Sequence, residues 1–156
     1  MPVSLQHSFI SSSPRLSCYN GKMNERITTA GVALKDGRVL VARRMKGGSL
    51  SEKWEFPGGK QRWGETDADT LRREYMEELA AEIEVGEKLV SFSFENGDTL
   101  YHLHAYLIAI LSDDLSLAVH TEMRWVDAEE LRALDMGGSD GKLREAALSV
   151  LLNTSL

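Results

Sequence analysis

Residues 54–79 of this chain read WEFPGGKQRWGETDADTLRREYMEEL and hold most of the structural information that the sequence offers. Trp54–Phe56 has the composition of a short strand, and the Pro-Gly-Gly that follows predicts its end. A helix is expected from Glu65 or Thr66 to about Ala81, because apolar side chains recur at helical spacing behind a capping sequence. Its core-facing positions are Ala68, Leu71, Tyr75 and Leu79.

Three glutamates lie together on this expected helix. Glu74, Glu77 and Glu78 are spaced i, i+3 and i+4, so at about 100° per residue they share one side of the helix. Like charges at this spacing destabilise a helix by roughly a few tenths of a kcal/mol per pair. A hard divalent cation such as Mg²⁺ would offset the repulsion, because it takes oxygen ligands. From the spacing alone, a solvated acidic helix face is the other interpretation.

The chain is acidic, with a formal net charge of −6 from 24 acidic and 18 basic side chains. Segment 65–84 contains eight acids and two bases, so it accounts for the whole excess. An acidic protein is a poor non-specific ligand for nucleic acids, because contacts with phosphates supply that affinity. We therefore expect no DNA or RNA polymer as a partner.

The cysteine content favours a reducing compartment, and the hydropathy indicates that the chain does not span a membrane. Cys18 is the only cysteine, which excludes an intramolecular disulfide and a cysteine-based zinc site. No apolar run approaches the ~18–20 residues of a membrane span, so no membrane partner is expected. The expected localisation is cytoplasmic.

The length of 156 residues predicts one domain. Residues 1–22 contain six serines and two charged side chains, and we expect them to form a disordered or weakly ordered tail. They lack the basic start and apolar run of a signal peptide, while a weak transit peptide stays open as an alternative. The folded domain is expected over residues 23–156.

Outside the central stretch, β-rich runs alternate with amphipathic helices. Some neighbouring runs are joined by hairpin signals such as Asp36-Gly37, whereas others flank helices. This mixture predicts an α+β protein, an α/β/α sandwich with a mixed sheet and helices on both faces. The expected strands are Arg26–Leu34, Arg38–Arg44, Leu89–Glu95, Thr99–Ile110, Leu115–Val119 and Met123–Val126. The expected helices are Ala128–Leu134 and Gly141–Leu152, capped by Asp127 and Asp140.

The central stretch resembles the Nudix box, the signature of the Nudix hydrolase family. Gly59 is followed after five residues by Glu65, after seven more by Arg73-Glu74, and after two more by Glu77-Glu78. The flanking residues resemble the MutT-like branch of the family, and the resemblance extends from about Arg26 to Leu152. It implies the mixed sheet and helices that the pattern predicts.

The resemblance also implies a metal site. Mg²⁺ or Mn²⁺ would be bound by Glu74, Glu77, Glu78, Glu122 and the carbonyl oxygen of Gly58. One of these glutamates would help to deprotonate the attacking water. Glu65 and Arg73 are expected to form an ion pair that holds the loop against the helix.

Substrate contacts are expected from four further residues. Arg43 and Lys60 would bind the polyphosphate, and Phe56 and Asp140 would contact the nucleotide, with Asp140 reading the edge of the base. Each of the two cations, and Glu122 as well, can also be interpreted as a plain surface charge.

The chain departs from the family pattern after Leu79, where Ala80 replaces the usual glycine. Alanine favours a helix over glycine by about 1 kcal/mol. We therefore expect the helix to run one or two residues longer, or to end without a left-handed turn.

The activity implied is hydrolysis of a nucleoside or deoxynucleoside triphosphate to the monophosphate and pyrophosphate, which would remove oxidised or otherwise unwanted nucleotides. Tyr101 lies near the position where the resemblance implies a tyrosine in dinucleoside polyphosphate hydrolases, so these compounds are an alternative class of substrate. A non-catalytic nucleotide-binding Nudix domain is the other alternative. The preferred base and the oligomeric state stay open.

Overall fold

The computed structural model describes residues 23–154. The expected tail, residues 1–22, lies outside the described residues, so its order stays a prediction. In chain order the elements are β1 (Asn24–Lys35), β2 (Arg38–Arg44), β3 (Trp54–Glu55), β4 (Gly58–Lys60), α1 (Asp67–Leu79), β5 (Ile83–Asn96), β6 (Thr99–Ile110), β7 (His120–Val126), α2 (Ala128–Ala133) and α3 (Ser139–Thr154). None of the helices in the described region is long and apolar enough to cross a membrane.

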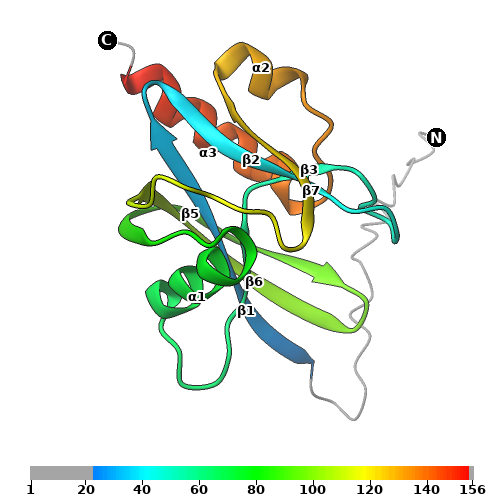
Figure 1. Ribbon diagram of the computed structural model, residues 1–156. Helices are drawn as coiled ribbons and strands as arrows, with labels where there is room; N and C mark the ends of the chain where they lie inside the picture. The colour runs from blue at the N-terminus through cyan, green and yellow to red at the C-terminus, as the bar shows by residue number, and fades with distance from the viewer. Residues whose placement is uncertain (1–22, 155–156) are drawn as a thin grey trace, which may run out of the picture.

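The long strand β1 organises a mixed sheet (Figure 1). One edge of β1 pairs in parallel with β6, which forms a long antiparallel hairpin with β5. The other edge is divided, because β4 pairs with Thr28–Ala30 and β2 pairs with Leu34–Lys35, both antiparallel. Strands β3 and β7 add to β2. This division lets β2 and β3 diverge from the β4 side of the sheet.

Two apolar cores lie on opposite faces of the sheet, as alternation along β2 shows. Val39 and Val41 pack into one core with Leu131 of α2 and Leu143 of α3. Leu40, between them, packs into the other core with apolar residues of α1. Helices therefore cover both faces, and the predicted α+β sandwich is confirmed.

Helix α1 begins as expected and ends differently. Thr66 accepts a hydrogen bond from the Asp69 backbone, and Asp69 accepts one from the Thr66 backbone, which completes the expected capping box. The expectation for the other end was wrong, because Ala80 takes a left-handed conformation at φ 53° and ψ 34°. This conformation costs a non-glycine residue about 1–2 kcal/mol. Backbone hydrogen bonds from Ala80 to Met76 and from Ala81 to Tyr75 offset the cost, as does burial of Ala81.

Three further expectations need correction. Residues 115–119 do not form a strand; Ser116 and Ala118 instead donate hydrogen bonds to the carbonyls of Leu79 and Glu78, which lack helical partners at the end of α1. Strand β5 begins six residues earlier than expected, because register shifts around Lys88 conceal its alternation. Asp140 does not cap α3, since the helix already begins at Ser139.

Candidate active site

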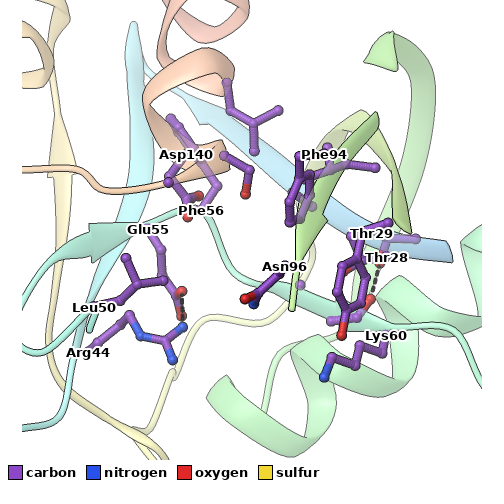
Figure 2. A pocket seen from close by; sticks show the side chains of 18 of the residues that line it. Thr28, Thr29, Arg44, Leu50, Glu55, Phe56, Lys60, Phe94, Asn96 and Asp140 are labelled. Atoms are coloured by element: carbon purple, nitrogen blue, oxygen red, sulfur yellow. Dashed lines mark hydrogen bonds and ion pairs between the residues drawn. The ribbon is translucent and has the colours of Figure 1, made fainter. Parts of the chain in front are cut away.

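A cavity of about 520 Å³ opens where the two halves of the sheet diverge (Figure 2). Residues from β1, the β3–β4 turn, the end of α1, the β5–β6 hairpin and the start of α3 line it. Figure 2 shows Arg44 and Glu55 on one side and Lys60 on the other, with Asn96 between them in this view. Of the residues expected from the sequence, Glu78, Gly58, Lys60, Phe56 and Asp140 line this cavity. The volume is in the range of small-molecule sites.

The acidic face of α1 contributes Glu78 to this cavity. Its Oε2 atom is buried and has no hydrogen-bond partner among the described residues. Burial raises the pKa of Glu78 to about 8, and the neighbouring carboxylates Glu74, Glu55 and Glu77 add to the effect. A buried, unpartnered carboxylate oxygen among like charges is unfavourable by itself and favours the approach of a cation.

The glycines of β4 allow α1 to approach the sheet closely. A Cβ built on Gly59 would overlap with the carboxylate of Glu74, and a Cβ on Gly58 would overlap with the backbone carbonyl of Thr29. At Gly58, where the obstacle is backbone, only glycine fits, whereas at Gly59 any larger residue would displace the carboxylate of Glu74. The acidic face of the helix is thereby held against the backbone of β4.

Arg73 connects the loop before α1 to the acidic face. Its Nε lies 2.5 Å from Glu65 Oε1, which confirms the expected ion pair. Its Nη1 lies 2.8 Å from Glu74 Oε1 and 3.3 Å from Glu77 Oε2, and its Nη2 donates to the carbonyl of Lys60. The hydrogen bonds from Arg73 lower the pKa of Glu65 to about 2.

The donor set suits a hard divalent metal ion, although it is not arranged around one. Among residues 23–154, no three His, Cys, Asp or Glu side chains are grouped as a metal site. Arg73 occupies one oxygen each of Glu74 and Glu77, while Glu78 Oε2 stays unpartnered within the described part of the chain. Carboxylate oxygens are the ligands that Mg²⁺ prefers, and these can turn from Arg73 toward an ion.

Six expected residues do not line the cavity: Glu65, Glu74 and Glu77 contact Arg73 as described above, and Arg43 and Glu122 lie on β2 and β7. Arg43 is not a lining residue of the cavity; its Nε donates to the carbonyl of Glu52. Glu122 pairs with Arg43 in the ladder, and its carboxylate accepts from Arg124 at 2.6 Å. Paired residues share a face of the sheet, and Arg43 also pairs with Trp54. Both side chains therefore belong to the face of Trp54.

The adjacent positions supply the residues that the sequence interpretation missed. Arg44 and Glu55 line the cavity and form an ion pair at 2.8 Å. Alternation along β2 could have indicated Arg44, because consecutive strand residues point to opposite faces. Its partner Glu55 follows Trp54 directly, and so does not share the face of Trp54.

Asp140 joins α3 to the β3–β4 turn. Its Oδ1 accepts a hydrogen bond from the backbone N–H of Phe56 at 3.0 Å, and both residues line the cavity. Burial raises the pKa of Asp140 to about 7, helped by the charge of Glu55, although the Phe56 hydrogen bond and the charge of Arg44 oppose the rise.

Lys60 and two aromatic rings form the opposite wall. Phe94 and Tyr101 stack with their ring centroids 5.4 Å apart, and the ammonium of Lys60 lies 5.4 Å from the Tyr101 centroid. Lys60, which was expected to bind the polyphosphate, is thus held at the cavity by the ring of Tyr101.

These features agree with comparison to known proteins. A model of the NUDIX domain matches residues 25–146, so the chain belongs to the Nudix family. Its relatives within that family are MutT-like. The chain is 36% identical over 121 residues to the "Putative 8-oxo-dGTP diphosphatase 2" of Mycobacterium tuberculosis (strain H37Rv), covering 76% of this chain and 84% of the relative. It is 31% identical to the "CTP pyrophosphohydrolase" of Escherichia coli (strain K12), covering 78% and 90% respectively.

Solved structures show the same fold. The solution structure of the E. coli ORF135 protein superposes with a TM-score of 0.71 at 30% identity, covering 82% of this chain and 91% of that one. The MutT protein from Methanosarcina mazei Go1 superposes with a TM-score of 0.70 at 20% identity, covering 86% and 97%.

Proposed function

We propose that this protein hydrolyses a nucleoside or deoxynucleoside triphosphate to the monophosphate and pyrophosphate, with Mg²⁺ or Mn²⁺ as cofactor. The observation that carries the proposal is the position of Glu78, whose buried, unpartnered oxygen adjoins a nucleotide-sized cavity. Glu74, Glu77 and Glu78 would hold the metal together with the carbonyl of Gly58. When bound, the metal supplies Lewis acidity and lowers the pKa of bound water.

The protein's own residues supply orientation and charge. Arg73 and Glu65 hold the acidic face of α1 against the loop before it. Lys60 and Arg44 are the cations at the cavity, and they would bind the polyphosphate from opposite walls. In this assignment Arg44 takes the role expected of Arg43. We assign no role to Glu122, because its side chain belongs to the face of Trp54 rather than to the face of Arg44 and Glu55.

The nucleoside would lie between Phe56 and Asp140. Phe56 offers an apolar contact, and the Asp140 carboxyl can donate or accept a hydrogen bond at the edge of a base, because its pKa lies near neutrality. The names of two relatives, "Putative 8-oxo-dGTP diphosphatase 2" and "CTP pyrophosphohydrolase", specify triphosphates with different bases. We infer a nucleoside triphosphate in the cytoplasm as the substrate, without a polymeric nucleic acid or membrane partner.

A nucleotide panel tests this proposal. The wild-type protein is incubated with 8-oxo-dGTP, dGTP, CTP and a dinucleoside polyphosphate, with Mg²⁺ and with excess chelator. The proposal requires monophosphate and pyrophosphate from at least one triphosphate, with no turnover in chelator and an unchanged circular dichroism spectrum. Release of inorganic phosphate, full turnover in chelator, or no hydrolysis of any triphosphate would overturn it.

A further inference from the structure

A buried histidine lies behind the cavity wall and touches Glu55. The side chain of His120 is only 2% exposed, and its Nε2 lies 2.7 Å from Glu55 Oε1. The other oxygen of Glu55, Oε2, lies 2.8 Å from Nη1 of Arg44. Glu55 and Arg44 line the cavity, whereas His120 is not among the lining residues. The three side chains form a chain of contacts that ends at the cavity.

A register shift in the β2–β7 ladder brings His120 to this place. Arg43 pairs with Glu122, but the next residue, Arg44, pairs with His120, so Thr121 is left over. In regular pairing Thr121 would oppose Arg44. Such bulges re-aim side chains, and they are frequent beside active sites. Because of the bulge, the imidazole of His120 lies behind Glu55 in place of the side chain of Thr121.

The electrostatics define the direction of the hydrogen bond. Burial opposes ionisation of Glu55, but hydrogen bonds from His120 and Arg44 outweigh it and hold the pKa of Glu55 below its usual value. An ionised carboxylate can only accept, so Nε2 of His120 carries the proton. Nδ1 is buried and has no partner among the described residues. Among the described residues, the imidazole of His120 therefore forms its side-chain hydrogen bond with Glu55.

We propose that His120 is a positioning residue for substrate binding. By fixing Oε1 of Glu55, it fixes the rotamer in which Oε2 holds the guanidinium of Arg44 at the cavity wall, where it would bind the polyphosphate. This role rests on the proposed hydrolysis of a nucleoside triphosphate. A histidine that only filled space would support the fold without acting through Glu55.

A double-mutant cycle separates these two roles. The variants are His120→Phe, Glu55→Gln and the double variant, assayed for KM and kcat on the best triphosphate with saturating Mg²⁺. We expect His120→Phe to raise KM about tenfold, the effect of one lost charge-assisted hydrogen bond. In the Glu55→Gln background the same substitution should change KM by less than about twofold, because the partner has lost its charge. His120→Gln, whose amide can reach Glu55, should restore most of the wild-type KM.

His104→Phe is the matched control. His104 makes the same kind of contact, 2.8 Å from Nδ1 to Asp67 Oδ2, and it is not a lining residue of the cavity. It should lower the melting temperature without raising KM. If His120→Phe does not fold, His120→Asn, whose amide is too short to reach Glu55, takes its place in the cycle.

Two results would overturn the positioning role: equal effects of the substitution in both backgrounds, or an unchanged KM in a folded His120→Phe protein. If the wild type hydrolyses no triphosphate, the proposed function fails instead, so the two failures are distinguishable.

Discussion

Gly59 on β4 and Glu74 on α1 lie so close together that a single added carbon on the glycine would overlap with the carboxylate. The contact fixes how the acidic face of α1 meets the backbone of β4. It also joins the two parts of the sequence motif, the glycine turn and the helix, which are fifteen residues apart. The neighbouring Gly58 is equally crowded, but by the backbone carbonyl of Thr29.

Gly59→Ala and Gly58→Ala should therefore fail in different ways. At Gly59 the obstacle is the end of a flexible side chain, so Glu74 can move and the fold survives. Because such a displacement removes a proposed metal ligand, we expect turnover to fall about tenfold or more with little loss of stability. At Gly58 the obstacle is backbone, and we expect a loss of about 1–3 kcal/mol from overpacking.

Urea denaturation and turnover of both variants, measured side by side, check this contrast. Each glycine variant is the control for the other, because both add one methyl group to the same short strand. Wild-type turnover in Gly59→Ala, or wild-type stability in Gly58→Ala, would contradict the geometry.

The sequence predicted those features of the fold that depend on local pattern. The capping box at Thr66 and Asp69 and the buried positions Leu71, Tyr75 and Leu79 depend on residues of a single helix, so their spacing was sufficient. The ion pair of Glu65 and Arg73 was likewise implied by the motif and is confirmed.

Features that depend on tertiary packing could not be predicted. Ala80 is a good helix former, yet burial of Ala81 and two backbone hydrogen bonds outweigh that preference. The contact between His120 and Glu55 joins residues 65 positions apart through a register shift that leaves no mark in the sequence. Alternation places Arg43 and Arg44 on opposite faces of β2, but which of these faces borders the cavity depends on tertiary packing.

Ala80→Gly should stabilise the protein. Glycine adopts the left-handed conformation at the end of α1 without the steric penalty that alanine meets, which is about 1–2 kcal/mol. The greater backbone entropy of glycine in the unfolded state offsets part of this stabilisation. We therefore expect a net increase of about 1 kcal/mol in the free energy of unfolding. Urea denaturation measures the change, with Ala81→Gly as a control that should destabilise by emptying a buried position. A loss of stability in Ala80→Gly would contradict the left-handed conformation of Ala80 at the end of α1.

Asp140→Asn should flatten the pH dependence of stability. The pKa of Asp140 is raised from 3.8 to about 7, so between these values the folded state keeps a proton that the unfolded state releases. The free energy of unfolding therefore falls as pH rises through this window. Asparagine does not titrate and can still accept the hydrogen bond from Phe56. Urea midpoints at pH 4 and pH 8 should show that the variant gains stability relative to wild type at the higher pH. A difference that is constant with pH would contradict the raised pKa.

The most direct measurement is the turnover number of Glu78→Gln with saturating Mg²⁺ and the best triphosphate. The substitution keeps the size of the side chain and replaces a carboxyl group whose ionised form burial and three neighbouring carboxylates disfavour, so the variant should fold at least as well as wild type. As a proposed metal ligand, Glu78 should be essential for rate, and we expect turnover to fall by about two orders of magnitude or more, equivalent to about 3 kcal/mol of transition-state stabilisation. Glu82→Gln, an exposed acid beyond the end of α1, is the control and should keep wild-type turnover. Wild-type turnover in a folded Glu78→Gln protein would contradict the placement of the metal on the acidic face of α1.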